Sequence, residues 1–439
     1  MPQAWLTRWC KQKRLRASAS GRPRRKRRRW RVIGIDEALD AVLAEVRPLG
    51  AERVSLLDAL GRACAAHVVS PEAVPGFANS AMDGFALRGE DLAEGRREFA
   101  VVAEIPAGRP SARHLFAGEA AKIMTGAPLP PGADTVVPVE LTVALEAGVL
   151  VTDPPAPGSN VRLAGEDLAP GDRLLGPGDT VGPAEIGLLA SVGVEMLPVA
   201  RRPRVAILAT GSELVPPGQP LAPGQIRNSN SFTAYAQVLE AGGDPILLGI
   251  ARDDAAETRR LLAAALEQDV VLTSGGVSVG EFDFVKQVQE ELGVERRFWG
   301  VKTKPGKPLA FGVRGSTLVF GVPGNPVASM VSFELYIRPA VLALQGRRDL
   351  YRPYVTAAAA EPVRAAKERA ELRRCRLVRR GDAWRFTTTG PQGSGILRSM
   401  ALAQGLAVVP AGHPGGPAGQ ELTVQLLEGS AEERPPYPV

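Results

Sequence analysis

Cysteine and histidine are scarce in this chain, and their scarcity excludes several kinds of site. The 439 residues include only three cysteines and three histidines, which lie far apart in the sequence. Such spacing cannot supply a disulfide framework, a cysteine zinc site or a histidine-based metal centre, and it gives no basis for a Ser-His-Asp hydrolase. Any bound metal must therefore use mainly oxygen ligands, and a reducing, cytoplasmic setting is expected.

Long apolar runs are also absent. No uninterrupted run of about 18 apolar residues occurs, which argues against a membrane-spanning helix. Glycine and proline, in contrast, are abundant, with 48 and 38 residues, so many turns and short strands are expected. The length predicts about two to four domains.

Acidic residues are missing from the first 31 positions, which contain 13 lysines and arginines. Residues 32–439 carry 40 basic and 47 acidic side chains, so the high pI belongs to this N-terminal stretch alone. Such a stretch is typical of nucleic-acid or acidic-lipid binding, of an organelle-targeting segment, or of a disordered extension ahead of a start near Val32. We expect the disordered extension, with no membrane binding and no physiological nucleic-acid binding.

Changes of hydrophobic period predict the fold class. Helical spacing predicts helices over Ile35–Arg47 and Val54–Ala63, and Val-rich runs between Gly and Pro turns predict a β-rich segment after them. Beyond Pro203, apolar strands alternate with amphipathic helices, which is typical of a parallel sheet. The expected class is α/β plus β, with a doubly wound parallel-sheet domain, a β-rich insert domain, a helical linker domain and a small C-terminal β-barrel.

The same changes set the expected domain boundaries. They are 1–31 for the basic extension, 32–70 and 160–200 for the helical linker domain, 71–159 for the β-rich domain, 201–347 for the α/β domain, 348–430 for the C-terminal β domain and 431–439 for a tail.

Doubly wound sheets bind ligands beyond the carboxyl ends of their strands, so the loops after Ala209, Ile250, Ser274 and Val322 form the predicted site. The run Thr-Ser-Gly-Gly-Val-Ser-Val-Gly-Glu at 273–281 follows a buried strand and opens a helix. Hydroxyls, backbone N–H groups and a helix N-terminus then converge on a space that fits a phosphate or molybdate anion. A tight connection that merely needs glycine is the alternative.

Carboxylates at the same edge supply the hard oxygen ligands that magnesium prefers. Glu213 follows the first strand, Asp253 follows the second, and Asp283 lies within the first turns of the helix after the third. A helix-dipole role for Asp283 and a plain surface role for Asp253 are the alternatives. We assign Asp254 to capping, because it forms a capping-box pair with Glu257.

Two lysines and several prolines follow in the same domain. The segment 304–308, Lys-Pro-Gly-Lys-Pro, presents two cations on a stiff chain, which suits a phosphate or diphosphate. An exposed basic turn has the same composition. Pro323 and Pro326 follow the last parallel strand and are expected to shape a rigid pocket wall.

The stretch 74–86, Val-Pro-Gly-Phe-Ala-Asn-Ser-Ala-Met-Asp-Gly-Phe-Ala, is more specific than a turn requires. It resembles the signature of the MoeA-type molybdopterin molybdenumtransferases, a family that includes the C-terminal domain of gephyrin. Further matches to the family follow in order at 123–127, 160–167, 209–214, 273–283, 304–308 and 321–327. The resemblance covers roughly residues 35–428.

This resemblance implies an enzyme that joins molybdate to the dithiolate of adenylylated molybdopterin and releases AMP as molybdenum cofactor forms. It implies a cleft between the α/β domain of one subunit and the β-rich domain of another, and hence a homodimer. Magnesium is the implied cofactor, the cytoplasm the implied location, and molybdopterin adenylyltransferase and other cofactor-synthesis proteins the implied partners.

The implied site residues fall into three groups. The catalytic residues are Asp83, Thr125, Asp167, Asp253 and Asp283. The substrate-binding residues are Arg162, Ser274, Gly275, Gly276, Ser278, Gly280, Lys286, Lys304, Lys307, Pro323 and Pro326. The metal ligands are Glu213, Asp253 and Asp283.

Two positions depart from the family pattern. Leu163 stands where many relatives carry a second basic residue, and Asn228 lies near a position where they carry an acidic one, so anion affinity is expected to differ. A molybdopterin adenylyltransferase resembles only the α/β domain and typically has Gly-Gly-Thr-Gly in place of Gly-Gly-Val-Ser-Val-Gly. A scaffold without turnover, as in gephyrin's clustering role, agrees less well with the retained carboxylates.

Overall fold

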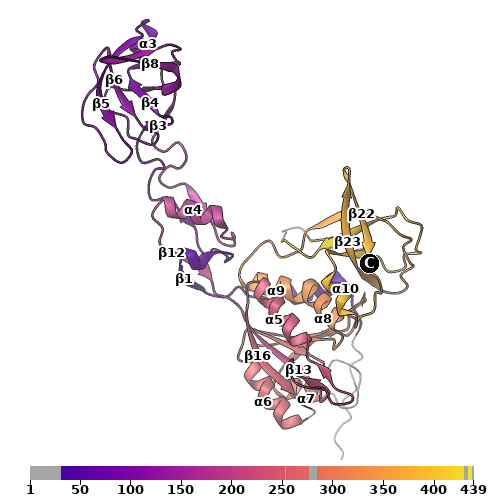
Figure 1. Ribbon diagram of the computed structural model, residues 1–439. Helices are drawn as coiled ribbons and strands as arrows, with labels where there is room; N and C mark the ends of the chain where they lie inside the picture. Colours follow the sequence, from indigo (N-terminus) through magenta and orange to yellow (C-terminus); the bar gives the residue numbers. More distant parts are fainter. Residues whose placement is uncertain (1–30, 253, 276–283, 430–433, 438–439) are drawn as a thin grey trace, which may run out of the picture.

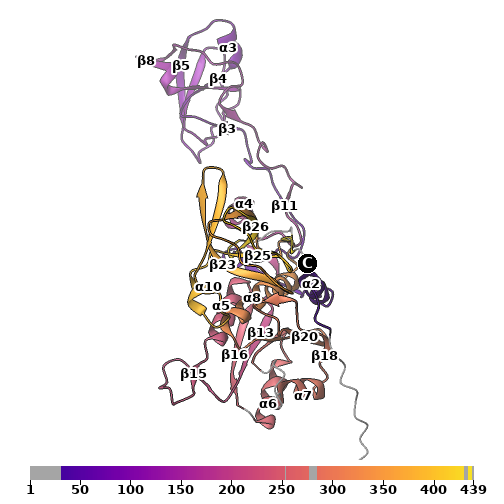
Figure 2. The same ribbon diagram turned by 90° about the vertical axis from the view of Figure 1, so that its right-hand side faces the viewer.

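The computed structural model describes residues 31–252, 254–275, 284–429 and 434–437. The molecule is elongated (Figures 1 and 2), with a β-rich domain at one end and the α/β domain at the other. A narrow linker region that contains α4 (Pro183–Ser191) lies between them, and the C-terminal strands lie beside the α/β domain.

A six-stranded sheet with the order β16-β13-β17-β21-β20-β18 forms the α/β domain. The strands are β13 (Arg204–Thr210), β16 (Asp244–Ala251), β17 (Val270–Ser274), β18 (Glu295–Trp299), β20 (Ala310–Arg314) and β21 (Thr317–Val322). The pairings among β16, β13, β17 and β21 are parallel, which confirms the predicted doubly wound sheet. β20 and β18 add an antiparallel edge, which the alternation of strands and helices in the sequence does not predict.

Helices cover both faces of this sheet. Val205 and Ile207 of β13 belong to the core that includes α5 (Asn230–Glu240) and the long helix after β21. Leu208, one position along, packs instead with α6 (Ala255–Ala265) and α7 (Phe284–Glu291). The alternation follows from the two-residue period of a strand. The predicted N-cap is confirmed, because a carboxylate oxygen of Asp254 accepts a hydrogen bond from Glu257 N–H at 2.7 Å. The Glu257 carboxylate accepts from Arg252 N–H at 3.3 Å and not from Asp254 N–H, so the reciprocal bond of a capping box is not formed.

The long helix consists of α8 (Pro326–Ser332), the π-helical turn η3 (Phe333–Ile337) and α9 (Arg338–Leu344). It is long and apolar enough to cross a membrane by length and composition, but 89% of its apolar window is buried inside the protein. It is therefore the core helix of the α/β domain, and α2 (Ile35–Leu43) packs against it.

The prediction of a helix over Val54–Ala63 was wrong. β1 (Ala51–Ser55) pairs with β12 (Met196–Ala200), and only a short 3-10 turn, η1 (Leu57–Ala59), follows. A pairing partner about 140 residues further along the chain decides this structure, because strand propensity depends on tertiary context. In the same region β2 (Val68–Val69) pairs with β11 (Arg173–Leu175).

The β-rich domain contains a six-stranded sheet with the order β7-β4-β6-β5-β9-β8. These strands are β4 (Gly84–Leu87), β5 (Glu98–Ile105), β6 (Glu119–Ile123), β7 (Thr135–Pro138), β8 (Thr142–Leu145) and β9 (Gly148–Val151), with the helix α3 (Gly89–Ala93) between β4 and β5. A separate ribbon of β3 (Asn79–Ser80) and β10 (Val161–Arg162) joins the entry and exit of this domain.

The C-terminal strands close into a small barrel, as predicted. They are β22 (Tyr354–Ala359), β23 (Ala370–Arg380), β24 (Ala383–Thr388), β25 (Gly405–Val409) and β26 (Glu421–Leu426). Closure arises because β23 pairs with β24 on one side and with β25 on the other. The short strand β19 (Thr303–Lys304), which comes from the α/β domain, pairs in parallel with β23 and ties the barrel to that domain.

Candidate active site

The loops after the four parallel strands meet at the carboxyl edge of the sheet. Thr210 ends β13, and its hydroxyl donates to the carbonyl oxygen of Ser274, which ends β17, at 3.2 Å. Gly275 N–H donates to the carbonyl oxygen of Val322, and Gly211 N–H to that of Ala251, at 3.3 and 3.2 Å. The described residues therefore show the expected convergence of the loops.

Gly275 lies against Thr210 so closely that no side chain fits between them. Its φ is +92°, and a Cβ there would lie 2.6 Å from the carbonyl oxygen of Thr210 and 2.7 Å from its hydroxyl. Both the backbone conformation and the space require glycine. Three further predicted members of this loop, Gly276, Ser278 and Gly280, lie outside the described residues.

Of the three predicted metal ligands, only Glu213 falls within the described part of the chain. Its side chain is exposed, and its carboxylate lies over Gly211, where a Cβ would come 2.5 Å from Oε2. Asp253 and Asp283 lie outside the described residues. Across the residues that are described, no group of three or more His, Cys, Asp and Glu side chains assembles. The magnesium site therefore stays a prediction.

Asn230, the first residue of α5, connects two of the site loops and was not among the predicted site residues. Its Nδ2 donates to the Ser274 hydroxyl and to the carbonyl oxygen of Gly324, both at 2.8 Å. Only 8% of Asn230 is exposed. The Asn-Ser-Asn run at 228–230, directly ahead of a predicted helix, is the signal that would have identified it.

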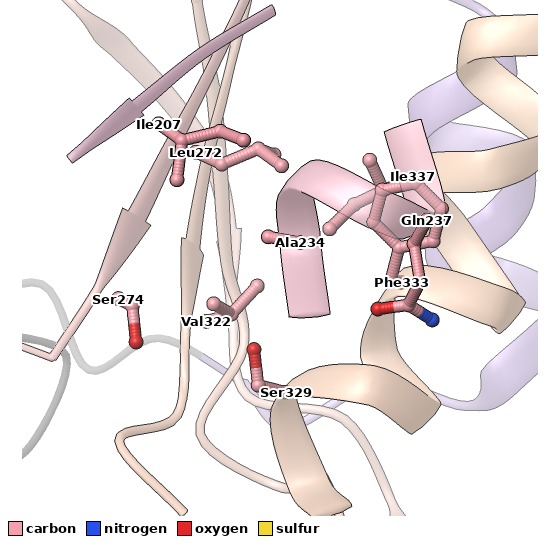
Figure 3. A pocket seen from close by; sticks show the side chains of 9 residues that line it. All are labelled: Ile207, Ala234, Gln237, Leu272, Ser274, Val322, Ser329, Phe333 and Ile337. Atoms are coloured by element: carbon pink, nitrogen blue, oxygen red, sulfur yellow. The ribbon is translucent and has the colours of Figure 1, made fainter. Parts of the chain in front are cut away.

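A small cavity lies between the sheet and the helices behind this edge (Figure 3). Its volume is about 10 Å³, enough for about one water molecule. The lining side chains are Ile207, Leu272, Ser274 and Val322 from the sheet, Ala234 and Gln237 from α5, and Ser329, Phe333 and Ile337 from the long helix. A space of this size has no room for a larger ligand.

Asp83 and Thr125 come together in the β-rich domain, as predicted from their motifs. One Asp83 oxygen, Oδ1, accepts hydrogen bonds from Thr125 N–H at 2.6 Å and from the Thr125 hydroxyl at 2.7 Å. These bonds, the backbone one first, lower the pKa of Asp83, because they stabilise its charged form. Both residues are exposed. The result is an ionised carboxylate held in a fixed orientation at the surface.

Arg162 lies on β10, and Asp167 lies five residues further along the same segment. Arg162 is the antiparallel partner of Asn79, and Asp167 N–H donates to the carbonyl oxygen of Val74 at 3.0 Å. Both predicted side chains are exposed. The segments 74–86 and 160–167, which are about 80 residues apart in sequence, are therefore neighbours in the structure.

Lys304 forms an ion pair with a residue of the C-terminal barrel. Its Nζ lies 2.9 Å from Oε1 of Glu371, which is its register partner on β23. Arg373 donates to Oε2 of the same carboxylate from Nε and Nη2 at 3.1 and 2.9 Å. Burial opposes ionisation of Glu371, but the bonds from Lys304 and Arg373 lower its pKa overall. Lys304 was predicted to bind substrate, and Glu371 was not predicted at all.

The other predicted binding residues are dispersed along the same domain. Lys307 is exposed. Lys286 on α7 places its ammonium 5.6 Å from the ring centroid of Trp299, within the range of a cation–π interaction. Pro323 is buried, and Pro326 is the first residue of α8, where the missing N–H of proline costs nothing.

Within one chain, the predicted residues form two separate groups. The strand-end cluster, which consists of Thr210, Asn230, Ser274 and Gly275, belongs to the domain that contains β13. The Asp83 group, which consists of Asp83, Thr125, Arg162 and Asp167, lies in and beside the β-rich domain, at the other end of the molecule (Figures 1 and 2). A single subunit does not bring the two groups into one site.

A doubly wound domain with polar groups at its strand ends, joined to a β-rich domain and a closed barrel, defines a multidomain α/β protein with a candidate ligand site at the carboxyl edge of its sheet. Three family profiles match successive parts of the chain. They are the MoeA N-terminal region (domains I and II) at residues 33–193, a probable molybdopterin-binding domain at 206–343 and the MoeA C-terminal region (domain IV) at 356–427. The chain belongs to the MoeA family.

Similarities to individual proteins support the same family. The chain is similar to molybdopterin molybdenumtransferase 2 of Mycobacterium tuberculosis, with 38% identity over 84% of this chain and 94% of that protein. It is similar to the molybdopterin molybdenumtransferase of Haemophilus influenzae, with 35% identity over 90% and 98%. Its fold matches the crystal structure of a molybdopterin biosynthesis MoeA protein from Pyrococcus horikoshii with a TM-score of 0.77, at 29% identity over 90% and 100%.

Proposed function

We propose that this protein is a molybdopterin molybdenumtransferase, which inserts molybdenum from molybdate into adenylylated molybdopterin, releases AMP and forms molybdenum cofactor. The observation that carries the proposal is the polar strand-end cluster around Ser274, because it lies in the region that matches a probable molybdopterin-binding domain. The named relatives, matched over most of their length, support the same reaction.

The strand-end cluster binds the anionic part of the substrate in this proposal. Ser274 supplies a hydroxyl, Gly275 lets the chain turn closely past Thr210, and Gly276, Ser278 and Gly280, which follow in the sequence, are the further candidates for hydroxyl and backbone N–H donors. Donors fixed in place before the reaction stabilise developing negative charge without reorganisation. Lys304 and Lys307 attract the phosphate groups as point charges, Lys286 adds a third cation, and Pro323 and Pro326 limit the movement of the adjacent wall.

The Asp83 group completes the site from a second subunit. Asp83, held by Thr125, is ionised and oriented, and Arg162 and Asp167 expose a cation and a carboxylate on the segment that pairs with β3. The distance between this group and the strand-end cluster within one chain supports a homodimer in which each site is shared. These residues orient the substrate for attack.

Magnesium is the cofactor of this proposal, with Glu213, Asp253 and Asp283 as its carboxylate ligands. The candidate ligands suit magnesium because all of them offer carboxylate oxygens, and Glu213 is exposed at the carboxyl edge of the sheet. When bound, the ion would neutralise the diphosphate linkage. The protein residues bind and orient the substrate, and Asp253 and Asp283 also contribute as catalytic carboxylates.

We place the reaction in the cytoplasm, after a molybdopterin adenylyltransferase that supplies the adenylylated substrate. Two of the three cysteines, Cys64 and Cys375, are free and buried, which suits a reducing compartment. Burial raises the pKa of Cys375 to about 12, so this thiol is unreactive.

The test is a reconstituted reaction. Purified protein, adenylylated molybdopterin, magnesium and micromolar molybdate are incubated, and AMP release is followed together with reconstitution of a molybdenum-free apo-oxidase. The expected result is AMP release that requires molybdate and yields active oxidase. Binding of the substrate without either product would favour a carrier or scaffold, and no binding would refute the proposal.

A further inference from the structure

Asn230 sits where three elements of the strand-end cluster meet. It begins α5, and its single amide nitrogen contacts the end of β17 through Ser274 and the loop after β21 through Gly324. Both distances are 2.8 Å, and the residue is almost fully buried. A buried amide that uses both of its N–H groups in this way is strongly constrained in orientation.

The donor and acceptor roles follow from the partners. A backbone carbonyl oxygen can only accept, so the amide group that faces Gly324 must be the nitrogen of Asn230. Its second N–H then points at Ser274, and the Ser274 oxygen must accept. The proton of the Ser274 hydroxyl is thereby directed to another acceptor, and among the residues described here none takes it.

We propose that Asn230 is a positioning residue that fixes the Ser274 hydroxyl as a hydrogen-bond donor toward an anionic oxygen of the substrate. The same amide holds the loops after β17 and β21 at a constant separation, so the donor is also fixed in space. This inference rests on the proposed function, in which Ser274 binds the oxyanion end of adenylylated molybdopterin. Asn230 acts through Ser274 and need not touch the substrate.

The decisive variant is Asn230→Asp, and the chain offers a matched control in Asn228→Asp. A carboxylate at position 230 can only accept, so it repels the Gly324 carbonyl oxygen and makes Ser274 donate to it instead. Asn228 is equally buried and lies two residues earlier, but within the described part of the chain its side chain bonds only Ser231: its Nδ2 donates to the hydroxyl at 2.9 Å, and its Oδ1 accepts from the N–H at 3.2 Å. Aspartate at 228 keeps the backbone bond and can accept the Ser231 hydroxyl.

The two variants add the same charge to the same helix start. The difference between their Kd values therefore reports the orientation of the Ser274 hydroxyl and not the added charge. We expect Asn230→Asp to raise the Kd for adenylylated molybdopterin by about 10- to 100-fold, the range for losing a hydrogen bond to a charged group. The Asn228→Asp variant does not touch Ser274, so it measures what an added negative charge at this helix start does to Kd by itself, and Asn230→Asp should raise Kd at least about tenfold more than it does. Equal effects of the two substitutions would refute the proposal.

A double-mutant cycle with Ser274→Ala separates positioning from a general effect on folding. If Asn230 acts through the Ser274 hydroxyl, its replacement should add no further loss of affinity once that hydroxyl is gone, although the melting temperature still falls. Equal losses in both backgrounds would overturn the proposal. Should Asn230→Asp fail to fold, Asn230→Ser removes the amide without adding charge, and the same cycle applies.

The outcome for the wild-type protein distinguishes this inference from the proposed function. Wild-type protein that neither binds adenylylated molybdopterin nor releases AMP refutes the proposed function, and the role of Asn230 falls with it. Wild-type protein that does both, with an Asn230→Asp variant of unchanged affinity, refutes the role of Asn230 alone.

Discussion

At the scale of single residues, Asp83 shows how a backbone N–H and a hydroxyl prepare a surface carboxylate for use. Thr125 donates both bonds to one carboxylate oxygen, Oδ1, and these bonds hold the pKa of Asp83 below its ordinary value. The other oxygen of Asp83 receives no bond from Thr125. It is therefore the atom that can meet a substrate or a second subunit.

We predict that Asp83→Asn lowers the rate of AMP release by about 10- to 100-fold, because the neutral amide cannot supply the charge that orients the substrate. Thr125 N–H can still donate to the amide oxygen, so the melting temperature should change little. The matched control is Asp153→Asn, which removes an exposed carboxylate from the same domain. Full activity of Asp83→Asn would remove this residue from the site.

The lowered pKa of Glu371 predicts that its contribution to the stability of the fold depends on pH. Its pKa is lowered in the folded protein, so its ion pair stabilises the fold above about pH 4.5, the ordinary value, and this stabilisation is lost as the pH falls through the lowered pKa. At pH 7 we expect Glu371→Gln to cost about 1 kcal/mol of unfolding free energy, since Lys304 is half exposed. Chemical denaturation from pH 7 to pH 3 should show the difference between wild type and variant shrinking below pH 4.5. A difference that is constant with pH would contradict this assignment.

At the scale of elements, the long helix carries a buried charge network on its π-helical turn. Glu334 accepts from Arg352 Nε at 2.9 Å and from Gln237 Nε2 at 3.0 Å, and the side chains of Glu334 and Arg352 are 5% and 4% exposed. Burial, and then the nearby charge of Arg352, lowers the pKa of Arg338 on α9 to about 10, so that guanidinium stays charged at neutral pH. The network fixes the helix against the strand that begins the barrel.

Removal of Arg352 should destabilise the protein, because the buried carboxylate of Glu334 loses its counter-ion. We predict that Arg352→Met destabilises the protein by about 3 kcal/mol, because Glu334 is left buried without its counter-ion. Urea unfolding measures the loss. Arg379→Met is the control, since the Arg379 side chain is 63% exposed and its partner oxygen is 4.0 Å away. A loss below about 1 kcal/mol for Arg352→Met would show that the neighbouring groups compensate for its charge.

At the scale of the whole molecule, the separation of the two residue groups makes subunit complementation the sharpest test of our proposal that the site is shared between subunits. Asp83→Ala and Ser274→Ala should each be nearly inactive. A refolded equimolar mixture should recover about a quarter of wild-type activity, because half of the dimers are mixed and each of those has one intact site. Activity is measured as molybdate-dependent AMP release. No recovery, with mixed dimers verified by mass spectrometry of tagged chains, would mean that each site lies within one chain.

The strands and helices with strong local patterns were predictable from the sequence. The parallel strands around Val205–Ala209 and Val270–Ser274, the long helix from Pro326 and the Asp254 cap follow from hydrophobic period and capping chemistry, which act over a few residues. The motif at 74–86 and its companions indicated the family. These features depend on local steric and hydrogen-bonding rules, so the sequence alone determined them.

Tertiary structure decided the features that depend on distant partners. β1 is a strand because β12 pairs with it, and Lys304 is held by Glu371 because β19 pairs with β23. Asn230 became a site residue only when α5, β17 and the loop after β21 met around one amide. Each of these contacts joins residues about 40 to 150 positions apart, and the free energy of such contacts comes from packing and hydrogen bonds that no local pattern encodes.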